Sequence, residues 1–297
     1  MKDDFLPYAS RSHTYWTGFY TSRSALKRYV RKTSNFLQGI RQLVSFTDLN
    51  DTKTMSALNR LERAMGVVQH HDAVSGTENQ HVANDYSKRL AGAVIECANL
   101  LPTVLSNISG VKNSDSLFYC PLLNISECKP IENSNSMQII VYNPLARQLN
   151  SWIRIPLVTN DYILAEENSA QSIDYQFLAI DSDTKRIPER DSSANFEIVF
   201  NARNLPALGF KVYNLKKAPP LSFGSKKAKQ VKEMKNNFLK NEFFKITFDD
   251  FGNLLNINTL DTQMETNVHQ KYCYYRSKEG DNKKGETQSS VLYFYLF

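Results

Sequence analysis

Apolar side chains recur every three or four residues along the first third of the chain, which is the spacing of one face of an α-helix. Three such series cover about residues 26–44, 55–68 and 82–101, with charged residues between their members. Thr77, followed three residues later by Gln80, has the pattern of a capping box that begins the third helix. This part of the chain is therefore predicted to form three antiparallel helices packed as a bundle.

After residue 136 the pattern changes to short runs rich in valine, isoleucine and aromatic residues, which favour β-strands. Four clear runs are residues 138–142, 152–157, 196–200 and 210–213. Residues 243–257 predict a β-hairpin, because a turn-forming Asp-Asp-Phe-Gly separates two further runs. The predicted fold class is α+β and multidomain, with a three-helix bundle followed by an antiparallel β-sandwich.

The expected domain boundaries follow these changes of pattern. We expect a connector over residues 1–23, the bundle over 24–110, a loop and linker over 111–136, and a β-sandwich region, incomplete at its C-terminus, over 137–297. The length of 297 residues suits about two folding units, and 41% hydrophobic with 22% charged residues is a globular composition.

Charge and hydropathy argue against two classes of partner. The formal net charge is +6, but the basic run over residues 226–235 has no interleaved aromatic residues to stack on bases. A solvated linker is therefore favoured over a nucleic-acid surface. No run reaches the roughly 18 apolar residues of a membrane span, and the first residues lack the apolar core of a signal peptide.

Other residues indicate the secretory route. Asn-x-Ser/Thr glycosylation acceptors begin at Asn50, Asn107 and Asn124. Cys120 and Cys128 enclose a short loop that contains one of them, and a disulfide is favoured there over two buried free thiols. Because these luminal features occur without an export signal, we expect the true N-terminus to lie upstream of residue 1.

The candidate chemistry lies in residues 69–77, where two histidines and an aspartate follow an apolar helical series. The helical spacing continues the buried stripe onto His71 and Asp72, so both are expected to point inward, towards a domain junction. A buried histidine beside a carboxylate suits a divalent metal. Since zinc needs at least three protein ligands, a capped helix end with a core histidine stays the alternative. The aromatic run 15–20 can stack on sugar or fill a core, and packing is favoured.

Together these segments resemble glycoside hydrolase family 38, in its lysosomal α-mannosidase branch. Residues 15–29, 69–86, 141–145 and 205–210 carry the resemblance, which covers nearly the whole chain and weakens after about residue 262. It implies a retaining, zinc-dependent α-mannosidase that removes terminal α-mannose from N-glycan oligosaccharides, in the lysosome or secretory pathway. The chain would be a fragment of that larger glycosidase.

The same resemblance implies roles for individual residues. His71 would be one of four ligands of an active-site Zn²⁺, Asp72 would hold mannose hydroxyls, and Trp16 would stack on the sugar. Tyr293 would line the pocket, although Ser290-Val291-Leu292-Tyr293 departs from the family's Ser-Gly-Ala-Tyr pattern. The other zinc ligands, the nucleophile and the general acid would belong to an N-terminal α/β domain that precedes residue 1. The chain alone is therefore expected to be inactive.

Two further expectations concern thiols and rival functions. In the family, the cysteine matching Cys97 pairs with a cysteine at the position of Ile40, so Cys97 is expected to be a free thiol; the pairing of Cys273 stays open. The alternative function is a non-catalytic module of bundle and sandwich that binds glycans or another protein. A nucleic-acid binder is the weakest hypothesis and predicts affinity that falls steeply with salt.

Overall fold

The computed structural model divides the chain into two compact units, Met1–Leu100 with Met234–Phe297, and Leu101–Glu233. The domain boundaries expected at residues 23, 110 and 136 stay predictions. The structure describes residues 9–11, 14–15, 17–109, 117–132, 134–169, 172–219, 229–230 and 237–269.

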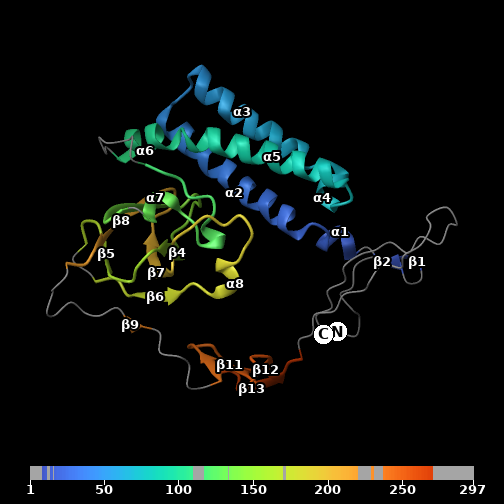
Figure 1. The fold of residues 1–297 in the computed structure, drawn as a ribbon, viewed down its shortest axis with the longest axis vertical. Coiled ribbons are helices and arrows are strands. Elements are labelled where there is room, and N and C mark those ends of the chain that lie inside the picture. Colours follow the sequence, from blue (N-terminus) through green and yellow to red (C-terminus); the bar gives the residue numbers. More distant parts are fainter. Residues whose placement is uncertain are drawn as a thin grey trace. The chain divides into compact units, whose positions relative to one another are not determined.

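The first unit is built on three long helices, α2 (Ser24–Thr47), α3 (Thr52–Val67) and α5 (Gln80–Ala98), each of which contacts the other two. Figure 1 shows them side by side. Their buried stripes follow the predicted spacing, and Ile40, Leu61 and Leu90 are at most 1% exposed. Asp51 caps α3, because its carboxylate accepts hydrogen bonds from the Lys53 and Thr54 amides.

The predicted start of the third helix is wrong. Asn79, and not Thr77, is the N-cap of α5, and Gln80 is its first residue. The Thr77 hydroxyl donates instead to Asp72 Oδ1 at 2.9 Å, and the Gln80 amide donates to Asn84 Oδ1. A separate short helix, α4 (His71–Ser75), therefore uses the threonine that the capping-box pattern assigned to α5.

Within the described residues, the helical stretch Gln80–Ile108 is long and apolar enough, by composition alone, to cross a membrane. Its α5 part, however, buries Leu90, Ala93 and Val94 in the helical core and contacts both α2 and α3. A helix packed in a core passes the same test of length and composition, so the expectation of no membrane span stays a prediction.

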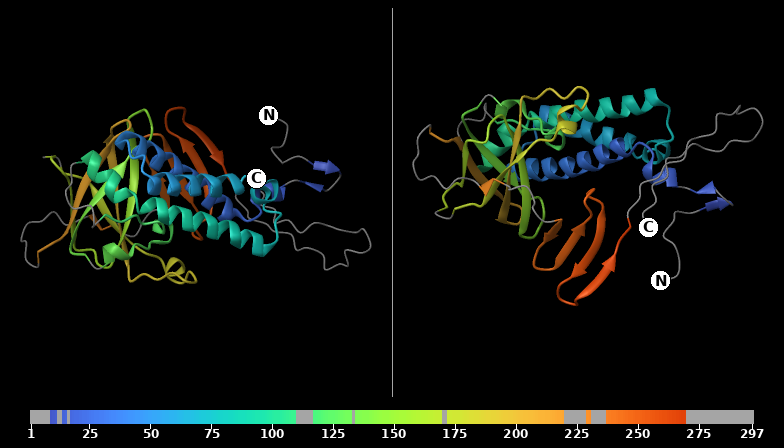
Figure 2. Two further views of the ribbon diagram at one scale, coloured as in Figure 1. Left: turned by 90° about the horizontal axis from the view of Figure 1, so that it is seen from above. Right: turned by 60° about the horizontal axis from the view of Figure 1, so that its bottom comes forward.

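Short strands complete the first unit. Strands β10 (Phe238–Lys240), β11 (Phe244–Phe248), β12 (Leu254–Thr259) and β13 (Met264–Asn267) form an antiparallel sheet, which Figure 2 shows from two directions. The predicted hairpin is confirmed as β11–β12, with Gly252 at φ +82° in its turn. The N-terminal segment carries β1 (Ala9–Arg11), β2 (Thr14–Tyr15) and helix α1 (Thr17–Thr21).

The second unit contains two sheets, with strand orders β3-β8-β5 and β4-β7-β6-β9. All neighbouring strands are antiparallel except β6 and β9. The strands are β3 (Ser136–Tyr142), β4 (Leu149–Leu157), β5 (Tyr162–Glu166), β6 (Tyr175–Ala179), β7 (Phe196–Leu205), β8 (Phe210–Lys217) and β9 (Lys229–Gln230). One apolar cluster joins them, with Leu157 and Phe200 from one sheet and Tyr213 and Leu215 from the other. This confirms the expected α+β class with antiparallel sheets.

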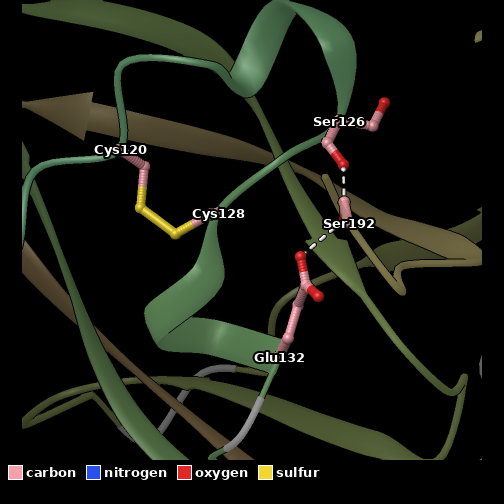
Figure 3. Close-up of a disulfide and its surroundings, with 5 residues drawn as sticks. All are labelled: Cys120, Ser126, Cys128, Glu132 and Ser192. Atoms are coloured by element: carbon pink, nitrogen blue, oxygen red, sulfur yellow. Dashed lines mark hydrogen bonds between the residues drawn. A yellow bond between two sulfur atoms is a disulfide. The ribbon is translucent and has the colours of Figure 1, made fainter. Parts of the chain in front are cut away.

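Short helices cover parts of the second unit: α6 (Leu101–Ser109), η2 (Leu123–Ile125), α7 (Lys129–Glu132) and α8 (Ser182–Lys185). The predicted disulfide between Cys120 and Cys128 is present (Figure 3). Beside it, the Ser192 hydroxyl donates to Glu132 at 2.5 Å and lies 3.4 Å from the carbonyl oxygen of Ser126. The disulfide loop is therefore fastened to the segment that precedes β7.

Candidate functional site

The candidate site is the short turn between α3 and α5 that carries His70, His71 and Asp72. Helix α3 ends at Val67, and α4 begins again at His71. His70 is the N-cap of α4, and its Nδ1 accepts a hydrogen bond from the Asp72 amide at 3.2 Å. An imidazole therefore satisfies one of the free amides at the start of α4.

The expectation that His71 and Asp72 are buried is wrong for this chain. The His71 side chain is 83% exposed and that of Asp72 is 45% exposed. The buried stripe of α3 stops at Val68, which is 1% exposed, and the chain then leaves the helical path. Periodicity cannot be extended across such a break, so it gave the wrong face for both residues.

The turn brings three potential metal ligands together. One donor atom each from His70, His71 and Asp72 lie within 4.8 Å of one another. His71 Nε2 lies 3.7 Å from Asp72 Oδ1, and the two imidazole rings have centroids 4.1 Å apart. Two imidazoles and a carboxylate are a donor set that suits Zn²⁺. His70, which the sequence did not single out, supplies the third donor that appeared to be missing.

Hydrogen bonds within the turn fix the Asp72 carboxylate. Its Oδ1 accepts from the Thr77 hydroxyl, while its carbonyl oxygen accepts from the Gly76 and Thr77 amides at 2.8 and 3.0 Å. The Ser75 hydroxyl donates to the carbonyl oxygen of His71 at 2.5 Å. Residues 71–77 therefore form a closed turn that presents its ligand atoms to solvent.

The turn is also packed against the junction of α1 and α2. Gly76 has φ +77°, and a Cβ atom there would lie 2.6 Å from the carbonyl oxygen of Ser22. The Ser22 hydroxyl donates to the carbonyl oxygen of Gly76 at 3.1 Å. Only glycine fits both the left-handed backbone and this close approach, which explains the glycine that follows α4.

Trp16 and Tyr293, the other predicted site residues, and Cys273 lie outside the residues that the structure describes, so the expectations about them stay predictions. The acceptor residues Asn50, Asn107 and Asn124 are all exposed.

Cys97 is free and fully buried, and its thiol donates to the carbonyl oxygen of Ala57 at 3.3 Å. Burial, with smaller contributions from Glu96 and Glu62, raises the pKa of the Cys97 thiol to about 11. The free thiol expected at this position is present, and its protonated state makes it unreactive.

Comparison with known proteins gives one consistent relationship. Residues 14–108 match the family described as alpha mannosidase middle domain. The lysosomal alpha-mannosidases of Homo sapiens and Bos taurus are 36% and 33% identical to this chain, over 98% of it. A probable alpha-mannosidase of Arabidopsis thaliana is 32% identical over 95% of the chain.

The chain spans about 28% of the length of the human and bovine relatives. A solved alpha-mannosidase from Enterococcus faecalis aligns with 94% of this chain and 32% of its own, at 12% identity and a TM-score of 0.46. The chain belongs to the α-mannosidase family, glycoside hydrolase family 38, and corresponds to a segment that includes its middle domain.

Proposed function

We propose that this chain is part of a zinc-dependent, retaining α-mannosidase that hydrolyses terminal α-mannose from N-glycan oligosaccharides. One observation carries the proposal: a donor set of His70, His71 and Asp72 lies on an exposed turn of a chain that is homologous to lysosomal alpha-mannosidases. An exposed cluster of this kind is suited to complete a site with residues from another part of the protein.

In this proposal His71 is the zinc ligand that the chain contributes, and Asp72 binds mannose hydroxyls. The Thr77 hydroxyl already occupies Asp72 Oδ1, so Oδ2 is left to accept a hydrogen bond from the sugar. Bound Zn²⁺ supplies Lewis-acid stabilisation of sugar oxygens. Trp16 stacking on the sugar and Tyr293 lining the pocket remain predictions from the family resemblance.

A retaining glycosidase also needs a nucleophilic carboxylate and an acid that face each other across the scissile bond. We assign neither to this chain and propose that both, with the other zinc ligands, belong to an N-terminal α/β domain outside the 297 residues. The isolated chain would then supply one of the zinc ligands and be inactive. Purified chain supplied with Zn²⁺ should not hydrolyse an α-mannoside, and clear zinc-dependent turnover would contradict this expectation.

Zinc content of the whole enzyme that contains this segment is the direct test of the site. In that enzyme, His71→Ala should lower both the bound zinc and the hydrolysis of an α-mannoside. His81→Ala is the matched control, because His81 is an exposed histidine on α5 outside the cluster. If His71→Ala binds zinc as well as the wild type, the proposed ligand role is wrong.

We also propose a lysosomal or secretory location. The names of the relatives, the Cys120–Cys128 disulfide and the exposed acceptor asparagines support it. Protein isolated from its natural source should lose mass on treatment with an N-glycan-cleaving glycosidase. A polypeptide with reduced Cys120 and no glycan would argue for another compartment.

A further inference from the structure

Arg23 connects the start of α2 to the segment that follows the His70-His71-Asp72 turn. It is the N-cap of α2 and has a left-handed backbone, with φ +52°. Its guanidinium donates from Nη2 to the carbonyl oxygen of Glu78 at 2.7 Å and from Nη1 to Gln80 Oε1 at 2.6 Å. One side chain therefore holds a residue of the α4–α5 connection and the first residue of α5, more than 50 positions further along the chain.

The counter-charge of Arg23 is buried. The Glu78 side chain is 2% exposed, and its Oε1 lies 3.4 Å from Arg23 Nε, while Arg23 itself is 25% exposed. Neither Glu78 carboxylate oxygen nor Arg23 Nε has a hydrogen bond among the described residues. A buried ion pair of this kind roughly offsets its own desolvation cost, so it contributes little net stability. Its effect is to restrict where the two charged groups, and the backbone that carries them, can lie.

The segment held by Arg23 is rigidly continuous with the ligand turn. Thr77, the neighbour of Glu78, donates from both its amide and its hydroxyl to Asp72. Gly76 is pressed against Ser22, which directly precedes Arg23. A displacement of residues 76–80 must therefore shift the Asp72 carboxylate and the helix turn that carries His71.

We propose that Arg23 is a positioning residue for the metal-ligating turn, with Glu78 as its buried counter-charge. The inference rests on the proposed zinc-binding function, but the part that says Arg23 holds the turn in place does not depend on zinc. The guanidinium fork is required because it reaches the Glu78 carbonyl and the Gln80 amide oxygen at once, which an ammonium group cannot reproduce.

The test uses the full chain and removes the pair without leaving a buried charge. In Arg23→Met/Glu78→Leu, apolar side chains of similar size replace the ion pair, so the urea midpoint of helix unfolding should stay near that of the wild type. Amide exchange at Gly76 and Thr77 should accelerate about tenfold or more. In the whole enzyme that contains this segment, Zn²⁺ affinity should fall about tenfold, as is usual when the support of a metal ligand is lost.

Two further variants make the result specific. Arg23→Lys keeps the charge but not the fork, and should show the same faster exchange even if the double variant folds poorly. Asp85→Leu/Arg89→Met removes an exposed ion pair of α5 and should change neither readout.

Unchanged amide exchange in both Arg23 variants would overturn the positioning role, whatever zinc does. If the whole wild-type enzyme binds no zinc, the proposed metal site fails, and the exchange comparison alone decides whether Arg23 holds the turn. Faster exchange with unchanged zinc affinity would also overturn the inference, because the turn would then move without affecting its ligands.

Discussion

Replacing Gly76 with alanine should be among the most destabilising single-methyl additions in the helical unit. An alanine at φ +77° carries the left-handed cost of about 1–2 kcal/mol. The new Cβ would also lie 2.6 Å from the carbonyl oxygen of Ser22 and 3.0 Å from its Cβ, so backbone must move. Such overpacking costs about 1–3 kcal/mol, which gives a total loss of about 2–5 kcal/mol in the free energy of unfolding.

Urea denaturation followed by circular dichroism at 222 nm measures this loss, because the long helices dominate that signal. Gly76→Asn separates the two causes: asparagine tolerates the left-handed backbone but still adds a Cβ, so it should stay strongly destabilising. Gly92→Ala is the control, since a Cβ at this helical position meets nothing within 4 Å and should stabilise α5 by up to about 1 kcal/mol. A Gly76→Ala protein within about 0.5 kcal/mol of the wild type would refute the reasoning.

Three other outcomes are expected. Leu90→Ala, at a fully buried position, should lower the free energy of unfolding by about 2–5 kcal/mol in the same urea assay. Because the pKa of Cys97 is about 11, alkylation at pH 8 should be at least about 100-fold slower in native protein than in urea, measured by mass spectrometry of its peptide; equal rates would contradict its burial. Burial raises the pKa of Glu132, but hydrogen bonds from Ser192 and Ser193 outweigh it and hold that pKa below its ordinary value. The stability that these hydrogen bonds contribute is complete above the pKa of Glu132 in the unfolded chain, and it is lost as pH falls through the lower pKa in the folded chain. The Ser193 amide should therefore exchange its hydrogen faster on acidification, and this change should be smaller in Glu132→Gln.

The helices were predictable because their apolar positions repeat over many turns, and the burial of Ile40, Leu61 and Leu90 follows that repeat. Strands β5 and β6, of five residues each, were not predicted, and each forms part of a sheet through its pairing with β8 or β7. Tertiary pairing, and not local pattern, makes them strands.

The His70-His71-Asp72 turn was located from its residue types but not in its geometry. The spacing argument failed at His71 because it assumed one continuous helix, whereas His70 ends one helical path and caps the next. The role of Thr77 was misjudged for a related reason, since its hydroxyl has two candidate partners and the Asp72 carboxylate is the one it reaches. Sequence spacing does not rank competing side-chain partners across a turn.

The fastening of the disulfide loop bears on the order of events during biosynthesis. Ser126, the hydroxyl residue of the Asn124-Ile125-Ser126 acceptor, is 5% exposed and donates to the buried Glu197 at 2.7 Å. A glycosyltransferase that binds this tripeptide must reach it before β7 packs against Ser126. Any sugar at Asn124 is therefore attached while the chain is still unfolded in this region. At Asn50 the corresponding Thr52 remains exposed, and that acceptor stays accessible after folding. Two acceptors of the same motif thus differ in when they can be glycosylated, because folding buries the hydroxyl residue of one and leaves that of the other exposed.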